Sequence, residues 1–128
     1  MKFIYISKEA DQQICGGVVY QGTPPELYNT PYIDSQGDWT KISTLQKAAR
    51  EFMASDRMFD MNHKGHEYQF SVLESMVIDE DGIVKFSHEL KKGAWLMTLR
   101  IDDDDVWQKI KSGELTGFSI GGSAYTEQ

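Results

Sequence analysis

The sequence predicts a single domain of the α+β class, because several short β-like segments accompany two amphipathic helical segments. The chain of 128 residues has the length of one domain. Between the two helical segments, residues 68–101 hold three β-like stretches, with a strong turn signal between the first two. Apolar residues at helical spacing predict the helices themselves, over residues 40–54 and 102–112.

Two strands and a long loop are predicted before the first helix. Residues 3–6 form a short apolar opening, and residues 14–20 form a second strand. The Gly16-Gly17 pair in the second strand indicates a bulge or the close approach of another backbone. Residues 22–37 contain all three prolines, which predicts a loop of 16 residues. Loops of this length are often functional or mobile.

The first helix is predicted to pack through one apolar face. The residues that recur at helical spacing on this face are Ile42, Leu45, Ala49, Phe52 and Met53. Asp38 or Thr40 can cap the start of the helix, because their side-chain oxygens accept hydrogen bonds from free backbone N–H groups.

The β-rich region is predicted to open with a strand over residues 68–78. Period-two alternation places Phe70, Val72, Met76 and Ile78 on one face and Leu73 and Val77 on the other. Glu74 shares the face of Phe70 and Val72. The Asp81-Gly82 pair predicts a hairpin turn into a return strand over residues 83–86. Residues 94–101 are apolar at both alternating sets of positions, which predicts a buried strand.

Four consecutive aspartates, Asp102–Asp105, open the second predicted helix. Its inward face is formed by Val106, Trp107 and Ile110, and Gly113 stands where a glycine commonly ends a helix. The aspartates do not predict a calcium site, because the spaced oxygen ligands, central glycine and terminal glutamate of an EF-hand are missing. We interpret them as first-turn charges that complement the helix dipole.

Composition and charge exclude several classes of function. The chain carries 13 basic and 20 acidic residues, a net charge of −7, and lacks the basic cluster of a nucleic-acid binder. A basic partner or a crowded protein assembly fits this charge better. No apolar run approaches the roughly 20 residues of a membrane span, and no signal peptide is recognisable, so we expect a cytoplasmic protein. The single cysteine, Cys15, excludes an internal disulfide.

Ser119 is the strongest candidate for a reactive side chain. It lies in the extended segment 114–125, within Gly117-Phe118-Ser119-Ile120-Gly121, which matches the G-x-S-x-G pattern. The α/β-hydrolase fold that usually carries this pattern is excluded, because only nine residues follow Ser119. Flanking glycines can still expose its hydroxyl, and N–H groups at Gly121 and Gly122 can stabilise an oxyanion. The alternative is a plain glycine-rich strand end.

A serine nucleophile needs a base, and the chain has three histidines. His63 lies beside a glycine between the first helix and the following strand, where a loop histidine can reach a cleft; the alternative is a solvated loop residue. We expect His88 to be exposed in its charged stretch. A third group would orient the base, and the spacing leaves Glu74, Asp60 and His66 as candidates. Glu74 stands out because a carboxylate on an apolar face is costly unless paired.

An ordered set of short motifs, spanning about residues 13–125, resembles a known family. In chain order the motifs are Gly17-Val18-Val19-Tyr20, Asp34-Ser35-Gln36-Gly37-Asp38-Trp39 before the Ala48-Ala49 helix, Asn62-His63, Val72-Leu73-Glu74-Ser75, Lys92-Gly93-Ala94-Trp95, and Gly113-Glu114-Leu115-Thr116-Gly117-Phe118-Ser119-Ile120-Gly121-Gly122. Together they resemble the XkdF-like phage serine proteases, a family related to prohead proteases and more distantly to the herpesvirus assemblins. Each motif is short, but the ordered set is specific.

The resemblance implies a mainly antiparallel, β-barrel-like core with about two flanking helices. By motif match it assigns Ser119 as the nucleophile and His63 as its base, with Glu74 as the first choice for the third group and Asp60 as the second. It implies acyl transfer without a metal or organic cofactor. The expected substrates are phage scaffold and major capsid proteins, cleaved inside the immature procapsid in the host cytoplasm, with self-association as a further possibility.

The chain departs from the assemblin pattern after the nucleophile. In the assemblins an oxyanion-binding segment follows the serine well downstream, whereas here Gly121 and Gly122 or another subunit would have to supply it. A catalytically silent structural or scaffolding component of the phage particle, with the same fold, is the main alternative. A third hypothesis, a host-directed accessory protein that binds a basic partner, is supported by the net charge alone.

The sequence contains no CxxC or HExxH motif, so it does not predict a zinc site.

Overall fold

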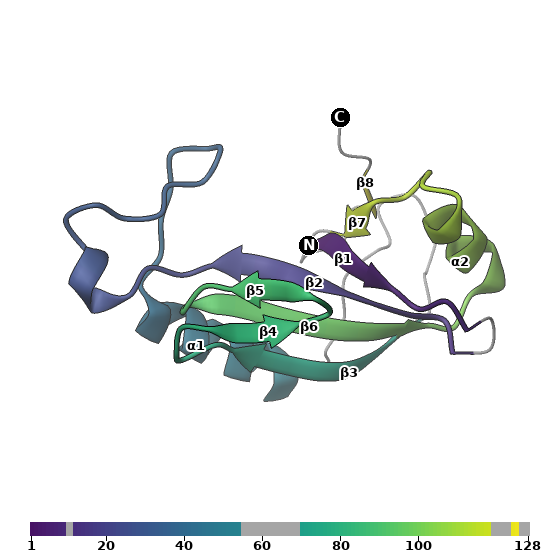
Figure 1. Ribbon diagram of the computed structural model, residues 1–128, viewed down its shortest axis with the longest axis horizontal. Helices are drawn as coiled ribbons and strands as arrows, with labels where there is room; N and C mark the ends of the chain where they lie inside the picture. Colours follow the sequence, from purple (N-terminus) through teal and green to yellow (C-terminus); the bar gives the residue numbers. More distant parts are fainter. Residues whose placement is uncertain (10–11, 55–69, 119–123, 126–128) are drawn as a thin grey trace.

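The computed structural model describes residues 1–9, 12–54, 70–118 and 124–125 (Figure 1). The strands are β1 (Lys2–Ile6), β2 (Ile14–Gln21), β3 (Phe70–Val77), β4 (Ile83–Lys85), β5 (His88–Leu90), β6 (Ala94–Ile101), β7 (Gly117–Phe118) and β8 (Ala124–Tyr125). The helices are α1 (Ile42–Ala54) and α2 (Asp104–Lys111), and a short 3-10 turn covers Pro25–Leu27 in the predicted loop. None of the helices in these ranges is long and apolar enough to cross a membrane.

Six strands form one antiparallel sheet in the order β3-β6-β2-β1-β7-β8. The sheet curls along its width, so that β1, β7 and β8 rise beside β2 like one half of a barrel (Figure 1). The predicted α+β class, with a mainly antiparallel, barrel-like core and two helices, is confirmed.

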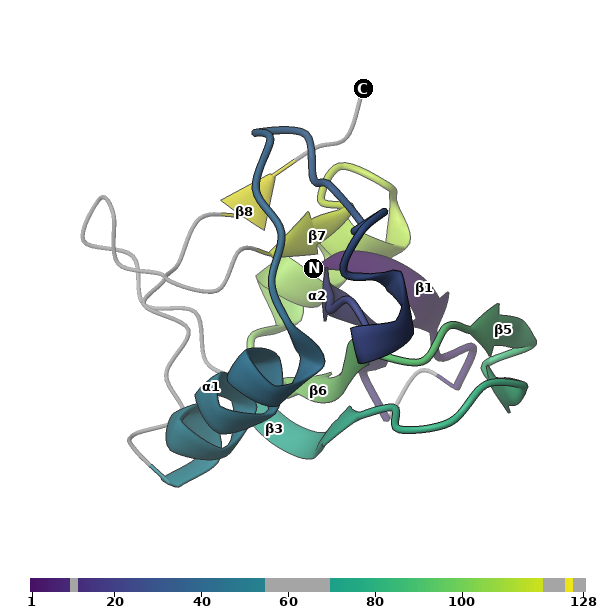
Figure 2. The same cartoon turned by 90° about the vertical axis from the view of Figure 1, so that its left-hand side faces the viewer.

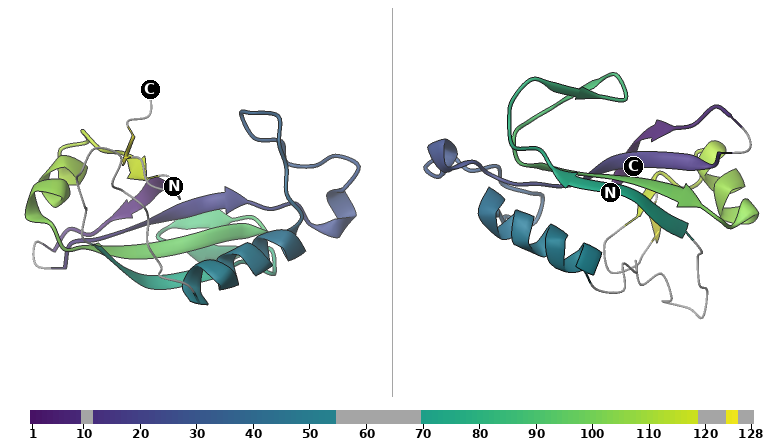
Figure 3. Two further views of the ribbon diagram at one scale, coloured as in Figure 1. Left: turned by 180° about the vertical axis from the view of Figure 1, so that it is seen from behind. Right: turned by 90° about the horizontal axis from the view of Figure 1, so that it is seen from below.

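Strand β6 separates the two halves of the core. Trp95, Met97, Leu99 and Ile101 point to the side that carries α1 and α2, here called the helix face. Ala94 and Leu96 point to the opposite side, covered by the β4–β5 hairpin and here called the hairpin face (Figure 3). The prediction of a strand buried on both faces is therefore confirmed.

Helix α1 begins two residues later than predicted, because the backbone before it is held in an extended pairing. The Thr23 N–H donates to the Thr40 carbonyl, and the Ile42 N–H donates to the Thr23 carbonyl. This partner satisfies the first N–H of the helix, which would otherwise lack an acceptor. Ile42, Leu45 and Ala49 are buried, as the predicted apolar face requires.

Helix α2 confirms the dipole interpretation of the aspartate run. Asp103 is the N-cap, and its carboxylate accepts hydrogen bonds from the backbone N–H groups of Asp105 and Val106. Acidic residues occupy the first turn and lysines the last, as the helix dipole favours. Gly113 follows the C-cap with a φ of 82°, a conformation that glycine adopts without steric cost.

A bulge in β3 makes the predicted division of its faces wrong. Val72 pairs with Leu99 and Glu74 pairs with Thr98, so the register shifts by one residue at Leu73. Phe70 and Val72 therefore lie on the helix face, whereas Glu74 and Met76 lie on the hairpin face with Thr98 and Leu96. An extra residue reverses every later side chain, because the side-chain period of a strand is two.

The strand predicted after the Asp81-Gly82 turn does not pair with the strand before that turn, although the predicted hairpin required this pairing. Strand β4 pairs with β5, which the sequence did not indicate, and the two form a separate two-stranded sheet. Their tight turn is Phe86-Ser87, with φ values of 53° and 63°. The Phe86 ring stacks on Tyr5 with 4.3 Å between centroids, which holds a non-glycine residue in this conformation. His88 is exposed, as predicted.

Cys15 is a core residue of β2. Its side chain is fully buried against the helix-face cluster. Burial raises the pKa of the thiol to about 12, because the thiolate would lose its contact with water. The side chain therefore packs rather than reacts.

Gly17 confirms the predicted close approach of another backbone. A Cβ atom at this position would overlap the Lys2 carbonyl oxygen of β1. The neighbouring Gly16 is less restricted, because its Cβ would lie 3.0 Å from the Phe86 ring and 3.1 Å from the Met97 carbonyl oxygen. The pairing of β1 with β2 thus depends on the missing side chain at Gly17.

We expect Gly17→Ala to lower the free energy of unfolding by about 2 kcal/mol or more, because the β1 backbone must move away from β2. Urea denaturation monitored by circular dichroism measures the loss. Gly16→Ala is the matched control and should cost less, since its Cβ would lie 3.0 Å or more from its neighbours instead of overlapping a backbone oxygen. Equal losses in the two variants would contradict the close-approach argument.

Candidate functional site

Most of the residues that the sequence singles out lie outside the described ranges. These are Ser119, His63, Gly121, Gly122, Asp60 and His66. Their assignments stay predictions. The structure does describe the residues that flank these positions in the chain, and it describes Glu74.

Phe118, which immediately precedes Ser119, is held firmly in the sheet. Its side chain is fully buried. Its N–H donates to the Met1 carbonyl over 2.8 Å, and its carbonyl accepts a hydrogen bond from the Met1 nitrogen. On its other side it pairs with Ala124 of β8. The strand that leads into Ser119 is therefore fixed by backbone pairing on both sides.

The ring of Phe118 contacts the first described residue after the segment that carries His63. Phe70 stacks on Phe118 with 5.7 Å between the ring centroids and 17° between the planes. Phe3 packs edge-on against the same ring at 5.2 Å. The structure thus brings a side chain of the strand that precedes Ser119 into contact with the first described residue after the His63 segment.

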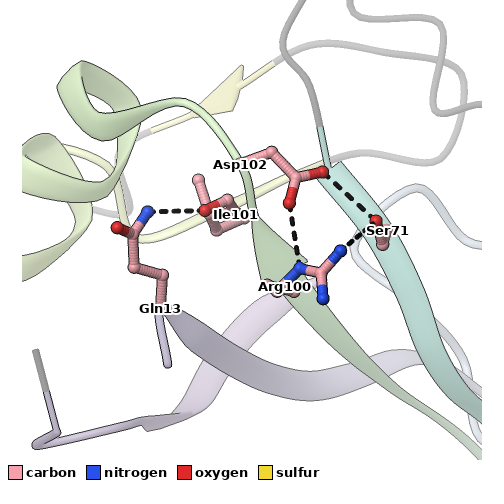
Figure 4. A network of polar contacts seen from close by, with 5 residues as sticks. All are labelled: Gln13, Ser71, Arg100, Ile101 and Asp102. Carbon is pink, nitrogen blue, oxygen red and sulfur yellow. Dashed lines mark hydrogen bonds and ion pairs between the residues drawn. The ribbon is translucent and has the colours of Figure 1, made fainter. Parts of the chain in front are cut away.

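A polar network next to Phe70 fixes the start of β3 (Figure 4). Arg100 Nε donates to Asp102 Oδ1 over 3.0 Å, and the Ser71 hydroxyl donates to Asp102 Oδ2 over 3.2 Å. Gln13 donates to the Ile101 carbonyl from the other side. Exposed ion pairs of this kind add little stability, so the network orients the strand end more than it stabilises the fold.

Glu74 differs from the expectation for a buried, paired carboxylate. Its side chain is exposed, and the β3 bulge places it on the hairpin face. Phe70 and Phe118 belong to the cluster on the helix face. The desolvation argument that favoured Glu74 therefore does not apply.

An open pocket of about 710 Å³ adjoins Met1 on the helix face, between α1 and the loop before it. Its apolar lining includes Met1, Val19, Leu45, Ala48 and Trp95, and its polar lining includes Tyr20, Asp34, Ser35, Gln36, Thr40 and Thr44. In Figure 2 this loop arches above α1 and toward the N-terminus. A cleft of this size falls in the range that holds ligands.

Asp34 organises the polar side of the pocket. Its Oδ1 accepts hydrogen bonds from the backbone N–H groups of Gln36 and Asp38, both over 2.9 Å. Its Oδ2 accepts the Tyr20 hydroxyl over 2.8 Å. The Asp38 N–H and the Tyr20 hydroxyl lower the pKa of Asp34, because both favour the carboxylate. Partial burial and the hydrogen bond to Asp34 raise the pKa of Tyr20.

Sequence reasoning did not single out Tyr20 and Asp34 as site residues. Both stand in motifs that carry the family resemblance, so the signal was present. What the sequence could not show is the bulge in β2, where the register shifts between Val18 and Tyr20. This bulge lets Val19 and Tyr20 both pack on the helix face.

The structure offers no metal centre in the part of the chain that it describes. Within residues 1–9, 12–54, 70–118 and 124–125, no three histidine, cysteine, aspartate or glutamate side chains converge on one point. The carboxylate of Asp34 accepts hydrogen bonds from the Tyr20 hydroxyl and two backbone N–H groups.

Comparison with known proteins gives one family and two relatives. Residues 2–128 match the family described as "Putative phage serine protease XkdF". The chain is 33% identical over 118 residues to the phage-like element PBSX protein XkdF of Bacillus subtilis, and 33% identical over 122 residues to the protein YqbD of the same organism. These matches cover 92% and 94% of the chain but only 39% and 35% of the relatives. No solved structure is significantly similar.

We expect Tyr20→Phe to raise the pKa of Asp34 toward its ordinary value, because the carboxylate loses one of its donors. The backbone donors remain, so the pKa should stay below the ordinary value. Carbon-13 NMR titration of the carboxyl groups measures the change. Tyr32→Phe is the control and should leave Asp34 unaffected; an unchanged pKa in Tyr20→Phe would contradict the role of the hydroxyl.

Proposed function

The chain belongs to the phage XkdF family, whose description names a serine protease, and we propose that it is a serine endopeptidase that cleaves phage scaffold and capsid proteins during prohead maturation. This activity would be exercised inside the immature procapsid, in the host cytoplasm. The chain spans about two fifths of the length of its XkdF relative, so the proposal concerns the domain rather than the whole of a longer protein.

The proposed chemistry is acyl transfer between Ser119 and a peptide carbonyl. His63 takes the proton of the Ser119 hydroxyl as the oxygen attacks, and it then protonates the departing amine. Backbone N–H groups at Gly121 and Gly122 are the candidates for stabilising the oxyanion. Water releases the acyl group by the same route, with His63 again as the base.

The stacking of Phe70 on Phe118 is the observation that supports this pairing of serine and histidine. Ser119 directly follows Phe118, and His63 precedes Phe70 by seven residues. Contact between these two anchors limits the distance over which the intervening chain must bring the two groups together. If Phe70 and Phe118 lay far apart, this support for the pairing of Ser119 with His63 would be missing.

The identity of the third catalytic group is part of the proposal. Glu74, the first choice from the resemblance, has the least support, because it is exposed on the face opposite the Phe70–Phe118 stack. Asp60 and His66 lie in the same segment as His63. We therefore favour a partner for His63 from within that segment.

The nucleophile is tested by intact mass after treatment with a reactive fluorophosphonate. We expect one adduct on the unmodified chain and none on Ser119→Ala or His63→Ala, because an isolated hydroxyl reacts too slowly. Ser123→Ala and His88→Ala are matched controls and should label normally. Labelling that survives in Ser119→Ala would contradict the assignment.

A chain that never labels, alone or within procapsids, would favour the catalytically silent structural component. Loss of capsid maturation in Ser119→Ala phage with normal shell assembly would favour the protease. Unchanged maturation would favour the structural alternative.

The third group is removed by either Asp60→Asn or His66→Gln. We expect the variant that removes it to slow fluorophosphonate labelling by about a hundredfold, because a histidine that is not held in orientation loses most of its activity as a base. Glu74→Gln should label at nearly the unmodified rate. Intact mass, measured after quenching the reaction at a series of times and reagent concentrations, gives the labelling rates. A large loss in Glu74→Gln alone would restore Glu74 as the third group.

A further inference from the structure

We propose that the pocket lined by Tyr20, Asp34 and Trp95 binds a lysine or arginine side chain of the substrate polypeptide. This inference rests on the proposed function, because it assigns the pocket a part in recognising the chain that is cleaved. Neither the family description nor the names of the relatives assigns any residue of this pocket.

The pocket lies next to the strand that leads to the proposed nucleophile. Met1 lines the pocket, and the same residue exchanges two backbone hydrogen bonds with Phe118. The pocket and the end of β7 therefore share Met1 as a common neighbour. Such proximity is what a subsite for a substrate side chain requires.

The lining suits a long side chain with an apolar stem and a polar tip. Trp95, Leu45 and Ala48 provide apolar surface from β6 and α1. Asp34, Ser35 and Gln36 belong to the loop and supply polar groups. Lysine and arginine combine a hydrocarbon stem with a charged head and bind at such boundaries.

The charge of the pocket selects a cation. Among the lining residues that the structure describes, Asp34 carries the one charged side chain. The terminal ammonium of Met1, which also lines the pocket, donates to the Phe118 carbonyl. Two of the lysines near the pocket contact aromatic rings outside its lining: Lys41 Nζ lies 5.1 Å from the centroid of the Tyr28 ring, and Lys91 Nζ lies 4.9 Å from that of the Tyr32 ring. Within residues 1–9, 12–54, 70–118 and 124–125, no cationic side chain pairs with the Asp34 carboxylate at the pocket.

The carboxylate is also fixed in place before any ligand arrives. Three donors hold it, two from the backbone of its own turn and one from Tyr20. These bonds leave Oδ2 with further accepting capacity, since a carboxylate offers about four lone-pair positions. A preorganised acceptor binds a cationic head without a large loss of side-chain freedom.

The test uses Ser119→Ala protein, so that binding is measured without cleavage. The probes are an alanine-serine heptapeptide with a central lysine and the same peptide with central norleucine, which keeps the stem and removes the charge. Titration followed by nitrogen-15 NMR should shift Thr44, Ala48 and the Trp95 indole. We expect the lysine peptide to bind about fivefold more tightly, as for a partly exposed ion pair. Raising sodium chloride tenfold should reduce this preference.

Asp34→Asn should abolish the lysine preference, because the amide keeps the turn hydrogen bonds but carries no charge. Asp104→Asn removes the same charge from exposed α2 and should leave the preference intact. Equal binding of the two peptides, no binding of either, or a preference that persists in Asp34→Asn would each overturn the pocket assignment.

Fluorophosphonate labelling of the unmodified chain separates the two proposals. Labelling without a lysine preference would leave the protease standing and reject the pocket. A lysine preference in a chain that labels neither alone nor within procapsids would reject the protease, while the pocket would stand as a binding site for basic peptides.

Discussion

The pairing of β1 with both β2 and β7 is the constraint on which the rest of the structure depends. Gly17 lets the Lys2 carbonyl approach β2 more closely than any side chain would allow. That approach places the Met1 backbone against Phe118, and Phe118 in turn meets Phe70. One missing Cβ atom thereby controls how the two ends of the chain meet, because β7 has only β1 to join it to the larger part of the sheet.

Two bulges then decide which side chains reach the helix face. In β2 the extra residue turns Val19 and Tyr20 to the same side, where Tyr20 meets Asp34. In β3 the extra residue turns Glu74 away from that side. Bulges commonly re-aim side chains beside functional sites, and here one creates a pocket wall while the other removes a carboxylate.

The sequence predicted the elements with strong local signals. The capped helix α2, the amphipathic α1 and the doubly buried β6 follow from periodicity and capping residues alone. It could not predict the Leu73 bulge or the Phe86-Ser87 turn, because both depend on distant partners: the pairing with β6 and the stacking on Tyr5. For the same reason the pocket, built from five separate stretches of chain, carried no local signal. Ser119 and His63 were indicated by local patterns and by the order of the motifs, and both stay predictions.

The proposed subsite and the strand that leads to the proposed nucleophile both contact Met1, but their functional groups come from different parts of the chain. Met1 joins them through its backbone, whereas Asp34, Ser35 and Gln36 of the pocket come from a loop that is not paired into the sheet. Loop residues such as Ser35 and Gln36 can therefore change without moving Phe118. Side chains of β1 and β2 cannot change in this way, because the pairing register of these two strands positions both the pocket and Phe118. The side chains of the proposed subsite can thus vary while the geometry beside the proposed nucleophile is kept, which would separate specificity from catalysis on one curled sheet.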